Sequence, residues 1–141
     1  MNEIMVGELS EFAEGGYRVL RVDTFEFGVF RQGDRVVAYE NYCPHDGGPV
    51  CQGKVIPRVE EELGPDQTSR GLRFSDKRNI VCPWHGWEFD MRNGQSWFDP
   101  KRVKIRSYPV AVERGEELQK GPYVAETFPV HVEDSYVIVE V

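Results

Sequence analysis

The first forty residues alternate between apolar and polar side chains in short stretches. Val, Phe and Tyr recur at almost every second position in four segments, Ile4–Leu9, Tyr17–Val22, Glu26–Arg31 and Arg35–Glu40. A period of two is typical of a strand that buries one face, and glycine-containing turns at 14–16 and 32–34 separate these segments. No helical period is sustained here. The pattern therefore predicts an all-β fold, an antiparallel sandwich or barrel.

Strand-like patterning continues in the second half of the chain. Glu88-Phe89-Asp90 predicts a further strand, and the Asn-Gly pair at 93–94 is a strong turn signal. The segment Tyr108-Pro109-Val110-Ala111-Val112-Glu113 recurs as Phe128-Pro129-Val130-His131-Val132-Glu133. Because each copy is entered through a proline, the echo predicts two edge strands. We expect His131, within the second copy, to be a structural or surface residue and not a metal ligand.

Two short turns each contain one cysteine and one histidine. The first is Cys43-Pro44-His45, and the second is Cys82-Pro83-Trp84-His85-Gly86. Two thiolates and two imidazoles suit either a structural zinc ion or a [2Fe–2S] cluster in which histidines replace two of four cysteines. Structural zinc sites usually pair like residues on one turn. The mixed Cys/His pairs favour an iron–sulfur cluster whose two ends differ.

These two turns resemble the cluster-binding loops of the Rieske family. The resemblance implies one [2Fe–2S] cluster per chain, with Cys43 and Cys82 on the inner iron and His45 and His85 on the outer iron. It also implies a Rieske-type β-sandwich or barrel with a small cluster-binding subdomain made of the two ligand loops. By position, Pro100 resembles the proline of a third loop that covers the cluster in this family.

The length of 141 residues predicts a single domain, residues 1–141, with the cluster-binding part at about 41–100. The family leaves roughly fifteen to seventeen residues between its first histidine and second cysteine, whereas this chain has 36. We therefore expect an insertion at about 52–78 and a second at about 111–130. The first combines an acidic half with a basic half. We interpret it as a solvated, partly mobile loop, with a docking flap beside the cluster as the alternative.

The charge and cysteine content narrow the range of partners and compartments. A formal charge of −7 argues against nucleic acid binding and offers an acidic face to a basic protein, although solubility alone explains it equally well. No apolar run approaches the roughly 20 residues of a membrane helix, and the N-terminus lacks the features of a secretory signal. We expect a cytoplasmic protein. With two cysteines as ligands, Cys51 has no partner for a disulfide within the chain.

A Rieske cluster by itself performs one-electron transfer. A terminal oxygenase would need a second iron held by two histidines and a carboxylate, and only His131 is uncommitted. The chain resembles the stand-alone ferredoxins that carry electrons from a flavin reductase to an aromatic-ring hydroxylating oxygenase. We therefore predict an electron-transfer component and not an enzyme in itself. Two alternatives remain: a small Rieske subunit of a multisubunit reductase such as nitrite reductase, and a zinc-stabilised interaction domain.

The second ligand turn also indicates the redox potential. In the high-potential branch of the family this loop resembles C-P-C-H-G-S-x-Y, whose extra cysteine joins a disulfide and whose hydroxyls donate to sulfur. The matching positions here are Trp84, Trp87 and Phe89. Without those donors the reduced cluster is stabilised less, so we predict a low potential for this class.

Overall fold

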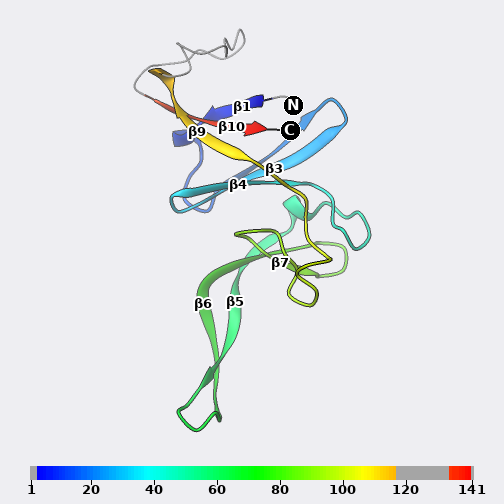
Figure 1. Cartoon of the computed structure of the whole chain (residues 1–141), viewed down its shortest axis with the longest axis vertical. Helices are drawn as coiled ribbons and strands as arrows, with labels where there is room; N and C mark the ends of the chain where they lie inside the picture. The colour runs from blue at the N-terminus through cyan, green and yellow to red at the C-terminus, as the bar shows by residue number, and fades with distance from the viewer. Residues whose placement is uncertain (1–2, 117–133, 141) are drawn as a thin grey trace. The chain divides into compact units, whose positions relative to one another are not determined.

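The structure, a computed structural model, describes residues 3–116 and 134–140 and is built almost entirely from antiparallel strands (Figure 1). Two 3-10 turns, Leu9–Glu11 and Val50–Gln52, interrupt them. The strands are β1 (Glu3–Glu8), β2 (Tyr17–Val22), β3 (Phe25–Gln32), β4 (Arg35–Glu40), β5 (Lys54–Leu63), β6 (Ser69–Val81), β7 (Glu88–Asp90), β8 (Ser107–Tyr108), β9 (Val110–Arg114) and β10 (Ser135–Glu140). The predicted all-β antiparallel fold is confirmed.

The chain divides into two compact units. The first contains residues 1–40 and 107–141, and the second contains residues 41–106. Both predicted ligand turns fall in the second unit, which begins at the residue where we placed the start of the cluster-binding part. In the described residues no helix is long and apolar enough to cross a membrane.

The first unit contains two sheets, ordered β1-β10-β9 and β2-β3-β4-β8. The four strands predicted from the first forty residues all form, and their alternation decides which side chains are buried. Phe27 and Val29 on β3 pack with Ala38 on β4 and with Val137 and Val139 on β10, all at most 1% exposed. This apolar core stabilises the unit without using either ligand turn.

The second unit contains one sheet, ordered β5-β6-β7. Strands β5 and β6 form a long hairpin, which Figure 1 shows as a green ribbon that extends from the short β7. The pairing of Val81 with Glu88 brings β6 and β7 together, so the second ligand turn is the connection between two hydrogen-bonded strands. This is the arrangement that positions Cys82 and His85.

The first predicted insertion, about 52–78, forms most of this hairpin, so the segment consists of paired strands and not of a loop, while most of its side chains are exposed, as expected for a solvated segment. The acidic half lies on β5 and the basic half on β6, and antiparallel pairing sets Glu60 opposite Arg73. Glu60 is within 3.9 Å of Arg58, 3.6 Å of Arg73 and 3.5 Å of Lys77. The two charge runs therefore compensate each other across the ribbon, a relation that appears only once the strands pair.

Several predictions from the last third lie outside the described residues. Residues 111–114 of the second predicted insertion belong to β9, but 117–130 are not among the described residues. The same holds for the second copy of the echo, 128–133, with His131. The first copy forms β8 and β9 around Pro109, and β10 then pairs with both β9 and β1.

Candidate metal centre

The first ligand turn is closed by two backbone hydrogen bonds. The Cys43 N–H donates to the Gly48 carbonyl at 2.8 Å, and the Gly47 N–H donates to the Cys43 carbonyl at 2.8 Å. Gly47 has φ +78°, a left-handed conformation that glycine adopts without steric cost. The closed turn buries Cys43, which is 1% exposed, and leaves His45 exposed.

The second ligand turn repeats this closure at the same positions. The Cys82 N–H donates to the Trp87 carbonyl at 2.8 Å, and the Gly86 N–H donates to the Cys82 carbonyl at 2.9 Å. Gly86 also has a left-handed φ of +74°. Cys82 is 1% exposed, whereas the His85 side chain is 44% exposed. Each turn therefore directs a thiol inward and an imidazole outward.

The two turns contact each other through their side chains. The rings of His45 and His85 lie 4.7 Å apart, centroid to centroid, at 81°. Trp87 stacks on His45 at 3.8 Å and 17°. A Cβ atom at Gly48 would lie 2.9 Å from the Trp84 ring and 3.0 Å from the Cys82 sulfur, so a side chain at position 48 would separate the turns.

The two buried thiols are neighbours. Burial raises the pKa of the Cys43 thiol above its ordinary value. The backbone N–H groups of His45 and Asp46 point toward its sulfur and oppose this effect, whereas the adjacent Cys82 thiol adds to it. Because burial and the Cys82 thiol outweigh these N–H groups, the Cys43 thiol stays protonated without a metal, and binding of a metal as thiolate requires release of that proton.

The donor set fits a [2Fe–2S] cluster. Such a cluster takes two protein ligands on each iron, and this unit provides a buried pair of sulfurs and an exposed pair of imidazoles. A single zinc ion needs four donors that converge on one point. Among residues 3–116 and 134–140, no group of three or more His, Cys, Asp or Glu side chains is arranged to hold one metal ion.

The third cysteine, Cys51, belongs to neither ligand turn. Cys51 is fully buried in the 3-10 turn that follows the first ligand turn. Its backbone N–H donates to the Asn41 side-chain oxygen at 2.8 Å. This bond ties the chain just after the first turn to the residue two positions before Cys43.

A polar and aromatic cluster supports the second turn. Trp97 donates through Nε1 to the Asn79 oxygen at 2.9 Å, and the Arg58 guanidinium lies 3.6 Å from the Trp97 ring. Asn79 is buried near the end of β6. At the end of β7, Asp90 accepts hydrogen bonds from the Arg92 backbone at 2.9 Å and from its guanidinium at 2.9 and 3.2 Å.

The aromatic contacts around the histidines were not predicted from the sequence. Trp87 stacks on His45, and Phe98 meets Trp87 edge-to-face at 4.5 Å. Phe98 lies two residues before Pro100, so the loop that contains this proline does reach the ligand turns. The signal was present in the spacing of aromatic residues around both turns, but only the fold shows which ring meets which.

The chain belongs to the Rieske [2Fe–2S] domain family, whose model matches residues 2–109. This range contains both ligand turns. The family therefore assigns a [2Fe–2S] cluster as the cofactor and excludes the zinc-stabilised interaction domain that the cysteine and histidine count had left open.

Curated relatives are ferredoxin components of ring-hydroxylating systems. The ferredoxin component of the naphthalene 1,2-dioxygenase/salicylate 5-hydroxylase systems of Ralstonia sp. is 23% identical over 112 residues, 79% of this chain and 88% of the relative. Ferredoxin CarAc of Metapseudomonas resinovorans is 27% identical over 104 residues, 74% of this chain and 78% of the relative.

Solved structures share the fold at low identity. The carbazole 1,9a-dioxygenase ferredoxin of Nocardioides aromaticivorans superimposes with a TM-score of 0.56 at 22% identity, covering 99% of this chain and 97% of that chain. A protein described as an NADH-dependent nitrite reductase small subunit from Mycobacterium tuberculosis gives 0.59 at 17% identity, with 99% and 96% coverage. At these identities the likeness concerns the fold alone.

Proposed function

We propose that this protein is a one-electron carrier whose [2Fe–2S] cluster is held by Cys43, His45, Cys82 and His85. One observation carries the proposal: two turns with the same backbone closure bring two buried thiols and two exposed imidazoles together. When bound, the cluster stores one electron by cycling between diferric and mixed-valence states.

The side chains divide the work between anchoring and electron exit. Cys43 and Cys82 would hold one iron of the cluster from the buried side of the turns, and the backbone N–H groups directed at the Cys43 sulfur would favour the negative charge that reduction adds. His45 and His85 reach the surface, so an electron enters and leaves on their side. Trp87 fixes the orientation of the His45 ring by stacking on it.

The carrier takes electrons from a flavin-dependent reductase and passes them to a terminal ring-hydroxylating oxygenase. The relatives that support this assignment are named as ferredoxin components of naphthalene and 3-phenylpropionate dioxygenase systems. In each cycle the loaded protein would accept one electron from the reduced flavin and donate one electron to the oxygenase. The protein is thus a cytoplasmic carrier, and catalysis takes place on the oxygenase.

Reconstitution with a known pair of partners tests this proposal. The cluster-loaded chain replaces the natural ferredoxin in a mixture of NADH, naphthalene dioxygenase reductase and its oxygenase, and naphthalene diol formation is measured. Product above a ferredoxin-free control supports the proposal, and His85→Ala should abolish it. Failure of the reductase to bleach the visible absorption of a protein that dithionite does bleach would contradict it.

A second candidate is the small subunit of a nitrite reductase, because one superimposed structure is described as such. The two functions differ in how long the protein stays bound to its catalytic partner. A subunit forms a stable complex with a large catalytic chain, whereas a carrier dissociates after each transfer. Size-exclusion chromatography of the affinity-tagged protein from its native cells separates them: co-elution with a large chain in fixed ratio would favour the subunit.

A further inference from the structure

The negative charge of the chain is unevenly distributed between the two units. Residues 41–106 contain eleven Lys and Arg against nine Asp and Glu, a formal charge of +2. The remaining residues contain six against fifteen, a formal charge of −9. The unit that contains the proposed ligands is therefore slightly basic, and the net negative charge of the chain, −7, comes from the other unit. The net charge of the whole chain therefore does not predict an acidic surface, suited to a basic partner, on the unit that contains the proposed ligands.

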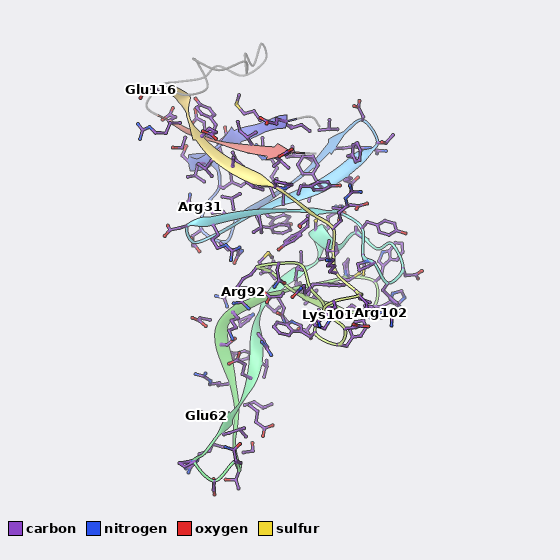
Figure 2. The ribbon with its side chains drawn as sticks, in the orientation of Figure 1. Arg31, Glu62, Arg92, Lys101, Arg102 and Glu116 are labelled. Carbon is purple, nitrogen blue, oxygen red and sulfur yellow. The ribbon has the colours of Figure 1, made fainter. Side chains whose placement is uncertain are left out.

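The positive charge near the ligand turns is concentrated in one short run after β7. Four exposed cations lie within the six positions 101–106: Lys101, Arg102, Lys104 and Arg106. None of the first three forms an ion pair within residues 3–116 and 134–140. Figure 2 shows Lys101 and Arg102 close together on this loop. By contrast, three of the hairpin cations are already paired with Glu60.

The loop that carries these cations is held by its backbone. The Val103 N–H donates to the Asp99 carbonyl at 2.9 Å, the Val103 carbonyl accepts from the Ser96 N–H at 3.0 Å, and the Ile105 N–H donates to Gly94 at 2.8 Å. Ile105 is 1% exposed and anchors the run in the unit. The half-buried Val103 and the buried Ile105 alternate with the exposed Lys104 and Arg106, so the positive groups project from a fixed support.

This basic run follows, in the sequence, the aromatic residue that contacts the proposed electron exit. His45 contacts Trp87 at 3.8 Å, Trp87 contacts Phe98 at 4.5 Å, and the run begins three residues after Phe98. Phe98 and Trp84, on the same unit, are 62% and 57% exposed. Exposed aromatic residues beside a patch of like charge are characteristic of a protein docking surface, with charge steering the encounter and apolar contact retaining it.

We propose that Lys101, Arg102, Lys104 and Arg106, together with Phe98, form the docking surface for an acidic face of the electron-transfer partner. The proposal rests on the proposed carrier function and adds the chemistry of the partner. Opposite charges accelerate association at low ionic strength, and salt screens this effect over a Debye length of about 10 Å at 0.1 M. Electron transfer to an acidic protein should therefore be fast at low salt and slow down as salt is added.

Two protein oxidants of opposite charge test the proposal without the natural partner. Dithionite-reduced protein is mixed with acidic plastocyanin or with basic cytochrome c in a stopped-flow instrument at several ionic strengths. We expect transfer to plastocyanin to fall with salt, and Lys101→Glu with Arg102→Glu to slow it about tenfold at low salt. Isothermal titration with oxidised plastocyanin should show the corresponding loss of affinity, a measurement that involves no electron transfer.

A matched variant controls for net charge. Arg70→Glu with Arg78→Glu makes the same change of charge in the same unit but on the hairpin, and it should leave the plastocyanin rate within about twofold of wild type. An equal effect of both double variants, or a wild-type preference for cytochrome c that weakens with salt, would overturn the proposal. So would tight binding of a labelled oligo(dT) that only the loop variant loses, since the run would then serve nucleic acid.

These outcomes are distinguishable from failure of the carrier function. If the protein is not a ferredoxin of a ring-hydroxylating system, the reductase and oxygenase assay fails, but the preference for plastocyanin persists. If the basic run is not a docking surface, the preference is absent while the cluster keeps its visible spectrum and the oxygenase assay still yields product.

Discussion

The turn that begins at Cys43 and the turn that begins at Cys82 close through the same two backbone hydrogen bonds, but different surroundings hold them. Strands β6 and β7 pair on either side of the second turn, so the sheet fixes its ends. The first turn is followed by a 3-10 turn, and side chains hold it in place: the Tyr42 ring packs on Gly47, and Trp84 packs on Gly48. One backbone design is therefore supported by main-chain pairing in one case and by aromatic packing in the other.

The largest effect is expected from removal of a proposed ligand. Replacement of Cys43, His45, Cys82 or His85 by alanine leaves one iron with a single protein ligand, so the visible absorption of the cluster should disappear in all four variants. Because cluster binding contributes to folding, each apo variant should also unfold at a lower temperature.

The buried Cys51 is the matched control for these variants. Cys51→Ala removes a thiol of equal size that our proposal does not use, so the protein should keep its colour while losing some packing energy. A bleached Cys51→Ala protein together with a coloured His85→Ala protein would overturn the ligand set.

The two left-handed glycines test the comparison directly. Alanine at Gly86 faces open space and should cost only the left-handed conformation, about 1–2 kcal/mol of unfolding free energy. Alanine at Gly47 should cost more, because its Cβ would lie 2.9 Å from the Tyr42 ring. Chemical denaturation of the cluster-loaded proteins measures both.

A double variant locates the source of the difference. Tyr42→Ala should make Gly47→Ala less costly, by about 1 kcal/mol or more in a double-mutant cycle, and should leave the cost of Gly86→Ala unchanged. Equal costs at the two glycines would mean that aromatic packing does not distinguish the turns.

The second turn also sets the expected redox potential. Phe89, on β7 directly after this turn, is fully buried and has no hydroxyl to donate to sulfur. Protein-film voltammetry of the wild type should give a potential at the low end of the range of about −150 to +300 mV for such clusters. Phe89→Tyr should raise it by ~40 mV, the equivalent of about 1 kcal/mol for one electron, if the new hydroxyl reaches a sulfur.

Phe27→Tyr, at a fully buried position in the other unit, is the control for this variant and should leave the potential unchanged. A wild-type potential well above zero at pH 7 would place the protein with the high-potential branch and contradict the carrier assignment.

The smallest effect concerns the Asp90–Arg92 pair at the end of β7. Burial opposes ionisation of Asp90, but the hydrogen bonds from Arg92 outweigh it, and the pKa of Asp90 lies below its ordinary value. Its contribution to stability is therefore present above the unfolded-state pKa of about 3.9 and is lost as pH falls through the lower folded-state value.

Arg92→Met should consequently lower the unfolding free energy by up to about 1 kcal/mol at pH 7, a modest amount because the guanidinium is half exposed. The difference from wild type should vanish in strongly acidic buffer. Arg102→Met, which removes a cation without an ion pair in the described residues, provides the reference. A deficit of Arg92→Met that stays constant down to pH 2 would show that packing, and not charge, is responsible.

Local signals in the sequence predicted the fold well. The period-two pattern identified β1 to β4, and the Asn93-Gly94 pair marked a turn whose Gly94 N–H donates to the Asp90 carbonyl at 2.7 Å. The period-two pattern did not identify the β5–β6 hairpin, because Pro57 and the run of three glutamates interrupt the alternation of apolar and polar residues in β5. Only the partner strand shows that these charges are compensated.

The four proposed ligands were recognisable because each turn carries its own Cys, His and Gly within a few residues. Their surroundings were not, since the contacts of Trp84 with Gly48 and of Trp87 with His45 join residues 36 and 42 positions apart. The basic run at 101–106 was not singled out from the sequence. Its relevance appears only when Phe98 is seen to contact Trp87.

The first and last residues of the β5–β6 hairpin are neighbours, because Lys54 pairs with Val81 immediately before the second ligand turn. The chain can therefore lengthen or shorten between the two turns without changing the distance between them, which explains how 36 residues fit between His45 and Cys82. Its far end closes through the Gly64 N–H and the Thr68 carbonyl at 2.9 Å. A fluorescent label or a whole fused domain inserted at Pro65–Gln67 should be accepted there, making this ribbon a practical handle for immobilising the protein on an electrode.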